Sequence, residues 1–187
     1  NALKVMQINH GPLKTLPSDI DAKFTKLSTL NLNHNQLIEV PDSLGNMKCN
    51  QLKLDNNNLN TLPDNVWGNE HIFWLEVDNN NISTIPESIS NSNTLTELQI
   101  SNNSLYKLPN ALFKLNIILF HVDGNKLKTI SSEIGQATSL QYLKFNNNNN
   151  ITNIPTEIGN LVKLVDFDIR NNAIETLPTS LESLDAL

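Results

Sequence analysis

The sequence is poor in cysteine, in arginine and in aromatic residues. Cys49 is the only cysteine among 187 residues, so no disulfide bond can form within the chain. Arg170 is the only arginine and the formal net charge is −6, which leaves no basic field to attract nucleic acid or an anionic membrane. No apolar run approaches the roughly 20 residues of a membrane-spanning helix. We therefore expect neither nucleic-acid binding nor membrane insertion.

Signatures of catalysis are missing as well. The sequence has no glycine-rich phosphate loop, no kinase signature and no Ser-His-Asp arrangement. His10 and His34 could approach each other, but no third ligand of a suitable kind lies near them, so we expect no metal site. We expect no cofactor and no enzymatic activity in this segment. Without paired cysteines or a visible targeting segment, we expect a cytoplasmic location.

What the sequence does contain is a repeat over nearly its whole length. Apolar residues recur as Leu-x-x-Leu-x-Leu, followed by x-x-Asn-x-Leu and by x-x-Leu-Pro-x-x-Leu, and positions are counted below from the first leucine. Eight copies start near residues 3, 27, 49, 72, 95, 117, 140 and 164. The fifth copy shows the motif clearly with Leu95, Leu98, Ile100, Asn103, Leu105, Leu108, Pro109 and Leu112. Such regular spacing predicts a stack of similar units.

Each part of the motif has a physical role. The alternating positions three to six predict a short strand with one face inward, and stacked copies predict a parallel sheet. Proline fixes its own φ and suits the start of a short helical turn behind the sheet. The asparagine at position nine can bond backbone groups that the turn out of the strand leaves unpaired. We call these residues the asparagine ladder: Asn35, Asn57, Asn80, Asn103, Asn125 and Asn172.

The pattern resembles the leucine-rich repeats, and its Leu-Pro-x-x-Leu segment resembles their intracellular, Ras-group class. The resemblance covers essentially the whole chain. It implies an α/β solenoid curved like a horseshoe, with a parallel β-sheet on the concave face and short helical or 3₁₀ turns on the convex face. It also implies a single repeat domain over residues 1–187 whose task is to bind another protein.

Neither end of the repeat array carries a recognisable cap. Few residues precede Leu3, the first repeat has Gly11 where the others have asparagine, and Leu187 would be the first position of a ninth repeat. A terminal repeat without a cap exposes its core and its strand edge. We therefore expect a fragment of a larger protein that self-associates or frays at its ends.

Positions three, five and seven of successive repeats point outward from the predicted sheet, and they predict the binding face. Trp74, Leu119 and Tyr142 are large side chains expected to be exposed, and exposed aromatic residues are typical of interface hot spots. Asp55, Glu76, Asp78 and Glu97 crowd beside Trp74, and a basic partner would relieve their repulsion. The predicted protein-binding residues are Trp74, Glu76, Asp78, Glu97, Gln99, Leu119, His121, Tyr142 and Lys144. The predicted partner has a basic and partly apolar surface, or is a neighbouring domain of the same protein.

Several functions remain open at this stage. The first is an interaction module of an intracellular signalling protein resembling the Roco family, in which repeats precede a Ras-like GTPase, a COR segment and a serine/threonine kinase. The second is a free-standing scaffold that binds a Ras-type GTPase. A third, an extracellular receptor or inhibitor, requires a signal peptide and cysteine caps that the sequence does not show.

Two local features have simple interpretations. The run Asn146 to Asn150 exceeds the repeat, and we interpret it as low-complexity sequence in a loop. Cys49 takes the place of a core leucine, so we expect a buried, unreactive thiol.

Overall fold

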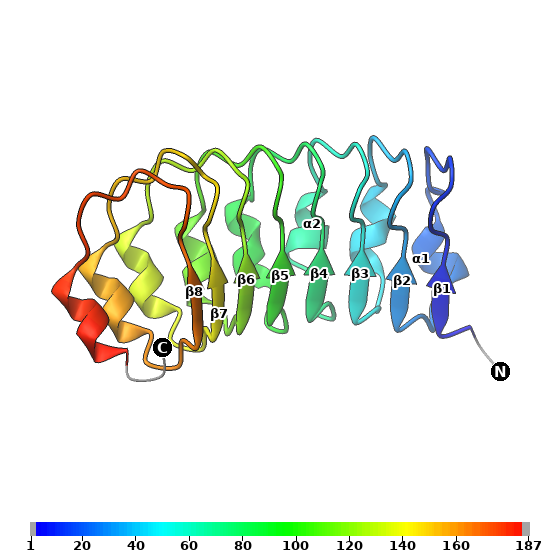
Figure 1. The fold of residues 1–187 in the computed structure, drawn as a ribbon. Coiled ribbons are helices and arrows are strands. Elements are labelled where there is room, and N and C mark those ends of the chain that lie inside the picture. Colours follow the sequence, from blue (N-terminus) through cyan, green and yellow to red (C-terminus); the bar gives the residue numbers. More distant parts are fainter. Residues whose placement is uncertain (1–2, 185–187) are drawn as a thin grey trace.

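The computed structural model describes residues 3–184, in which the chain coils into eight stacked repeats. Each repeat contributes one three-residue strand to a parallel sheet with the strands in sequence order (Figure 1). Neighbouring strands pair in the same register throughout the sheet, from Val5 opposite Thr29 to Lys144 opposite Asp168. The strands are β1 (Val5–Gln7), β2 (Thr29–Asn31), β3 (Gln51–Lys53), β4 (Trp74–Glu76), β5 (Glu97–Gln99), β6 (Leu119–His121), β7 (Tyr142–Lys144) and β8 (Asp166–Asp168).

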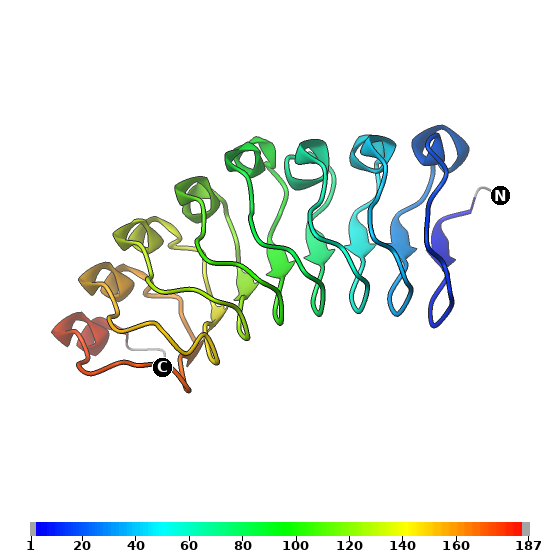
Figure 2. The same cartoon turned by 90° about the horizontal axis from the view of Figure 1, so that it is seen from above.

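Short helical turns run along the opposite side of the stack. Seen from above, the stack bends into a shallow arc with these turns on its outer side, so the fold class predicted from the sequence is confirmed (Figure 2). The turns are α1 (Ile20–Lys23), η1 (Asp42–Asn46), α2 (Asp64–Trp67), η2 (Glu87–Asn91), η3 (Asn110–Lys114), η4 (Ser132–Gln136), η5 (Thr156–Asn160) and η6 (Thr179–Ser183), where η marks a 3₁₀ helix.

Proline sits one residue before six of these eight turns rather than at their first helical residue. Pro41 and Pro109 both have extended backbone and directly precede a 3₁₀ helix. The Pro41 carbonyl accepts a hydrogen bond from the Leu44 N–H at 2.9 Å, which closes the first turn. Proline thus directs the chain into the turn while its missing N–H costs no hydrogen bond.

The core lies between the strands and the helical turns and is almost wholly aliphatic. Repeated leucine positions such as Leu30, Leu52 and Leu98 are fully buried. Each fully buried side chain of this size contributes about 1.5–3 kcal/mol relative to an exposed one. Larger side chains fill the wider spaces, and Phe120 packs edge-on against Phe145 with ring centroids 6.1 Å apart.

Position eight of every repeat has a left-handed backbone. Non-glycine residues there have φ between 53° and 57°, and Gly124 has φ 64°. Asparagine adopts this conformation at lower cost than most residues, and glycine adopts it freely. Two positions of the repeat therefore favour asparagine, the ladder position and this turn. The position-eight residues are His10, His34, Asn56, Asn79, Asn102, Gly124, Asn147 and Asn171.

The terminal repeats are less well covered than the interior ones. Leu177 is 68% exposed, whereas Leu62 at the same position of the third repeat is 2% exposed. Turn η6 contains no buried residue. Leu187, expected at the first position of a ninth repeat, lies outside the described residues. Within residues 3–184, no helix has the length and apolar character needed to cross a membrane.

Candidate protein-binding face

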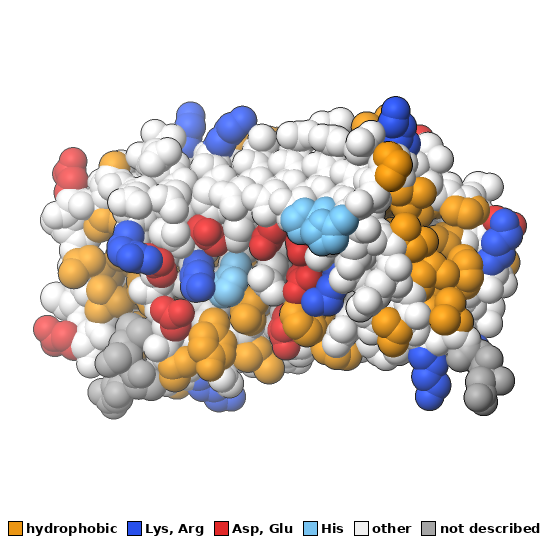
Figure 3. Space-filling model, turned by 45° about the vertical axis from the view of Figure 1, so that its right-hand side comes forward, with side chains coloured by type: hydrophobic (Ala, Val, Ile, Leu, Met, Phe, Trp, Pro, Cys, Tyr) orange, Lys and Arg blue, Asp and Glu red, His pale blue; other side chains and the backbone are white. Residues whose placement is uncertain are grey.

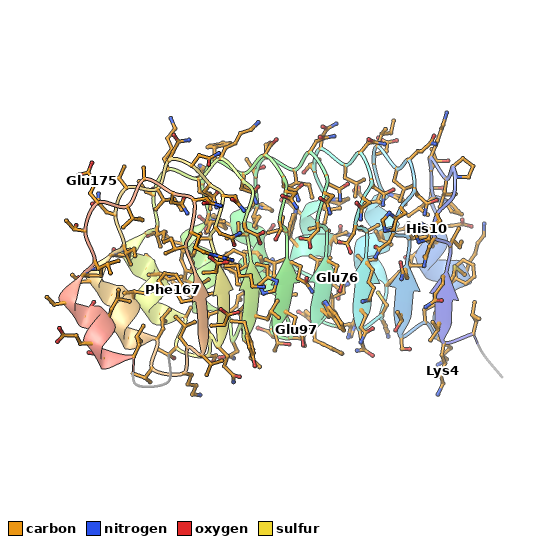
Figure 4. The ribbon with its side chains drawn as sticks, in the orientation of Figure 1. Lys4, His10, Glu76, Glu97, Phe167 and Glu175 are labelled. Carbon is orange, nitrogen blue, oxygen red and sulfur yellow. The ribbon has the colours of Figure 1, made fainter. Side chains whose placement is uncertain are left out.

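The concave face is formed by the outward side chains of the strands and of the residues just beyond them. The middle residue of each strand is mostly buried, as for Leu75 and Leu98, so its two neighbours point outward. Neighbouring strands lie about 4.8 Å apart. Figure 4 labels Glu76 and Glu97 on adjacent strands of this face. The register aligns position three as Trp74, Glu97, Leu119 and Tyr142, and position five as Glu76, Gln99, His121 and Lys144.

Trp74 is less exposed than the sequence suggested. Its ring is only partly accessible, and the Lys53 ammonium nitrogen lies 3.9 Å from the ring centroid. A cation over an indole face is attracted by the ring quadrupole. The chain itself therefore places a basic group beside Trp74 and its acidic neighbours, where the sequence predicts the basic surface of a partner.

Glu76 is also engaged within the chain. It is 8% exposed, and its Oε1 lies 3.0 Å from the Lys53 ammonium nitrogen. The Gln99 amide donates a weaker hydrogen bond to the same oxygen at 3.4 Å. Glu76 is therefore less accessible than its outward position predicts, because the ion pair with Lys53 covers it. Removing Lys53 would leave a buried charge unpaired, which is costly.

An apolar cluster lies on strands β6 and β7. Tyr142 is 40% exposed and stands beside the partly exposed Leu119 in the paired register. Ile118, one residue before the strand, is also exposed and extends the cluster. Sequence reasoning missed Ile118 because it considered only positions three, five and seven. Glu97 separates this cluster from Trp74 in the position-three column.

The acidic residues of position seven hold the edges of neighbouring strands together. One Asp55 carboxylate oxygen accepts the Asp78 N–H at 2.8 Å, and Asp78 in turn accepts the Ser101 N–H. The side-chain oxygen of Asn33 likewise accepts a hydrogen bond from the Asp55 N–H at 2.8 Å. These side chains are therefore structural acceptors, and they are only partly available to a partner.

Burial raises the pKa values of Asp55 and Asp78. The pKa of Asp55 is raised to about 7, chiefly because burial disfavours its charge; the Asp78 N–H opposes the rise, and the charges of Glu76 and Asp78 add to it. The pKa of Asp78 is raised to about 6 for the same principal reason, with further contributions from Asp123 and Glu76. The acidic field beside Trp74 is therefore weaker near neutral pH than the sequence implies.

The remaining predicted residues occupy the C-terminal half of the face. His121, Gln99 and Lys144 are all half-buried. Burial lowers the pKa of His121, and the Lys144 charge lowers it further, so the imidazole is neutral at pH 7. Glu97 is half-buried and takes part in none of the salt bridges found among residues 3–184. It is the carboxylate of the predicted set that remains open to a cationic partner.

The ladder asparagines tie adjacent repeats together through the backbone. Asn103 donates to the carbonyls of Ile100 and Ser101 in its own repeat and of Val77 in the preceding repeat. Its Oδ1 accepts the Ile82 N–H at 2.9 Å. The same pattern of bonds occurs at Asn35, Asn57, Asn80 and Asn125.

The asparagine run of the seventh repeat is more than low-complexity sequence. Asn148 is 1% exposed, donates to the Phe145 and Val122 carbonyls, and accepts the Leu127 N–H. It is the ladder residue of this repeat, which the sequence interpretation missed. The additional residue is accommodated at Asn149, whose φ of 66° adds a second left-handed residue to the turn.

Other candidate chemistry is structural or lies on the surface. The imidazoles of His10 and His34 stack with centroids 4.3 Å apart. Across residues 3–184, no group of three or more His, Cys, Asp or Glu side chains is arranged to hold a metal ion. Cys49 is fully buried, and burial raises the pKa of its thiol to about 11, so it is unreactive near neutral pH.

The repeat motif matches the model of a known family. The family model described as Leucine Rich Repeat matches residues 26–47, 94–115 and 139–161. The chain carries leucine-rich repeats. Proteins with this fold act as scaffolds for protein interactions. A search of curated proteins found no match.

Solved structures share the fold over nearly the whole chain. A leucine-rich-repeat protein of Leptospira interrogans is 27% identical with a TM-score of 0.93, over 98% of this chain and 47% of that chain. An internalin from Listeria monocytogenes is 26% identical with a TM-score of 0.80, over 99% and 53% respectively. The plant peptide hormone receptor RGFR1, in complex with RGF2, is 22% identical with a TM-score of 0.84, over 99% and 35%. The chain thus spans about half or less of the length of these leucine-rich-repeat proteins.

Proposed function

We propose that this leucine-rich-repeat chain binds a protein partner through the concave face of its fourth to seventh repeats. The observation that carries the proposal is the cluster of Ile118, Leu119 and Tyr142, which leaves apolar surface open on two neighbouring strands. Large apolar and aromatic groups on a rigid, well-packed support are typical of interface hot spots. No bond-making chemistry is assigned to this face.

The partner is expected to be partly apolar and basic. An apolar group would cover Tyr142 and Leu119, while a lysine or arginine would approach Glu97 and the adjacent acids. A nearby cation also favours the charged form of Asp55 and Asp78. Because these acids have raised pKa values of about 7 and about 6, binding of a cation would release protons near neutral pH. Affinity should therefore rise between pH 5.5 and pH 8.

The similar structures support a protein or peptide partner in general terms. One is a plant peptide hormone receptor in complex with RGF2, and another is the Toll–Spatzle complex from Drosophila. These partners belong to those proteins. What they share with this chain is a fold that presents a long, regular face to another polypeptide.

For the cellular setting, we propose an intracellular signalling protein resembling the Roco family, with these repeats binding a partner or a neighbouring GTPase or kinase domain. The support is the Leu-Pro-x-x-Leu segment and the single, buried cysteine. The alternative is a free-standing scaffold for a Ras-type GTPase. Binding that depends on the nucleotide bound to such a GTPase would favour the alternative.

The test uses the double variant Trp74→Ala/Tyr142→Ala in affinity capture from cell lysate, followed by titration of the captured protein. We expect affinity to fall at least tenfold, because loss of a hot-spot side chain costs about 2 kcal/mol or more. Tyr106→Ala is the matched control, since Tyr106 is exposed but lies outside the strands. Circular dichroism would verify that all variants fold. Equal binding by the double variant and the control would refute the proposed site.

A further inference from the structure

Trp74 and Glu76 lie beside each other on the concave face, and together they form an aromatic–acidic site. They stand on either side of the buried Leu75 in β4, so both side chains lie on the same face of the sheet. Figure 4 labels Glu76 near the middle of the sheet, and Figure 3 shows acidic and basic side chains gathered near the middle of the molecule. An aromatic ring beside a carboxylate attracts cations.

The aromatic–acidic site is occupied by another side chain of the same protein. Lys53 stands directly opposite Glu76 in the register of β3 and β4. Its Nζ lies 3.9 Å from the centroid of the Trp74 ring and 3.0 Å from the Glu76 Oε1. The ring and the carboxylate thus hold one ammonium group together. This occupant indicates the chemical class that the site accepts, which is a primary ammonium on an aliphatic chain.

Two contacts position the aromatic–acidic site without help from Lys53. The Gln99 side chain, on β5, donates a hydrogen bond to the Glu76 Oε1 at 3.4 Å. The Nε1 atom of Trp74 is buried, so the edge of the indole ring that carries it packs against the protein. We therefore expect the site to persist when Lys53 leaves it. A site that is fixed in advance loses little free energy to ordering when a cation binds.

Lys53 is free to leave the site. Its side chain is 19% exposed, and within residues 3–184 its only salt bridge is the one with Glu76. The four-carbon stem of lysine is flexible, so rotation of the side chain alone brings the ammonium into water. Glu97, directly opposite Trp74 on β5, is half-buried and forms no salt bridge in the same part of the chain. Its carboxylate draws a second cation toward the site.

From this occupied site, we propose that Trp74 and Glu76 recognise a lysine side chain of the protein partner, and that Lys53 is its internal competitor. The partner's ammonium takes the place of Lys53 over the ring and beside the carboxylate. The incoming lysine belongs to the partner of the concave face, so this step rests on the proposed function. Displacing Lys53 offsets part of the gain, and a free cation therefore binds weakly. A partner that also covers Leu119 and Tyr142 binds tightly, so the face selects a lysine beside an apolar surface.

The test empties the site and refills it with a small molecule. Lys53→Ala leaves Glu76 buried without its ion pair, which should lower the midpoint of thermal unfolding by roughly 5 °C or more. n-Butylammonium has the four carbons and the ammonium group of a lysine side chain. At ten times its dissociation constant it should restore about 3 °C of the loss. The measurement is thermal unfolding by circular dichroism, with n-butanol and sodium chloride at the same concentration as controls for the apolar chain and for salt.

Lys107→Ala is the matched control variant. The Lys107 Nζ lies 5.9 Å from the ring of the exposed Tyr106, outside the strands, and forms no salt bridge within residues 3–184. n-Butylammonium should give no specific gain in Lys107→Ala or in the unmodified chain, where Lys53 fills the site. Lys53→Gln, which keeps a donor for Glu76 but carries no ammonium, is a second variant in case Lys53→Ala does not fold. Equal gains in the Lys53 and Lys107 variants, or an equal gain with n-butanol, would overturn the proposed site.

A second measurement tests the competition itself. In titration of the partner captured through the concave face, Lys53→Ala should bind roughly tenfold more tightly than the unmodified chain, because no internal ammonium has to be displaced. Weaker binding by Lys53→Ala would show that Lys53 contributes to the contact, and it would overturn the competitor role. The n-butylammonium measurement uses no partner. It therefore decides whether the site accepts an ammonium even if the capture experiment with Trp74→Ala/Tyr142→Ala refutes the proposed function.

Discussion

The fifth and eighth repeats share one motif but differ in how many hydrogen bonds their ladder asparagine makes. In the fifth repeat, Asn103 donates three hydrogen bonds and accepts a fourth from the Ile82 N–H. In the eighth repeat, Asn172 donates three, but its buried Oδ1 has no partner among the described residues. The seventh repeat, which supplies the partner N–H in the regular pattern, carries the additional residue Asn149 in this turn.

The difference shows that each repeat depends on the geometry of its neighbour. The same asparagine in the same motif position makes a full set of bonds only where the preceding turn has the regular length. Stability in such a stack is approximately a sum of repeat and interface contributions. The interior repeats, which carry the candidate binding face, therefore form the stiffer part of the molecule.

The largest expected effect comes from breaking the ladder in the interior. Asn103→Ala removes all four bonds and leaves buried backbone groups unpaired, so we expect a loss of about 2–4 kcal/mol in the free energy of unfolding. Asn172→Ala should cost about 1 kcal/mol, because its groups lie nearer to solvent. Urea denaturation of both variants would measure the difference. Equal losses would contradict the proposed contrast between the repeats.

A second effect concerns the buried carboxylate of Asp55 in the interior repeats. The folded-state pKa of Asp55 is about 7, against an ordinary value of 3.8, so ionisation of Asp55 lowers stability as the pH rises from about 4 to about 7. Asp55→Asn should gain about 1–2 kcal/mol at pH 8, a value discounted for partial exposure, and little at pH 4. Asn33 shows that an amide accepts the next N–H equally well at this position. A gain that is equal at both pH values would argue against a charge effect.

Removing one asparagine from the run at 146–150 should repair the C-terminal junction. Any of the five deletions gives the same sequence, in which Asn148 and the following isoleucine regain the regular spacing. The Asn172 Oδ1 could then accept the isoleucine N–H, a gain of about 1 kcal/mol. Hydrogen exchange of residues 164–181 would detect slower opening of the eighth repeat. Faster exchange there would show that the extra residue stabilises the junction.

The smallest expected effect lies at the left-handed turn. Asn102 has φ 53°, so Asn102→Ala should cost about 0.5–1 kcal/mol, while Asn102→Gly should be nearly neutral. Thermal unfolding of the pair would separate backbone strain from side-chain contacts. A large loss in Asn102→Gly would assign the asparagine a role through its amide group instead.

Much of the fold follows from the spacing alone. The eight strands, the aliphatic core and the convex helical turns are direct consequences of where leucine and proline recur. The left-handed turn was not foreseen, because its position carries His, Asn or Gly, and these residue types share only a backbone preference. Asn148 was overlooked because a run of identical residues hides which one is in the ladder position.

The binding face was predicted less completely than the fold. Periodicity placed Trp74 and Glu76 on the correct side of the sheet, but it carries no information on how side chains of adjacent repeats pair. Lys53 reaches both residues from β3, and this contact depends on rotamers and on burial. The exposure of Ile118 depends on the local packing of the residue that precedes strand β6, which a motif template does not describe.

The central claim is that the concave face of the fourth to seventh repeats binds a protein partner. The most direct measurement is hydrogen–deuterium exchange of this chain with and without the captured partner. We expect added protection at residues 74–78, 97–101, 118–123 and 142–146, with no change in the convex turns. Added protection confined to the convex turns, or to the two terminal repeats, would contradict it.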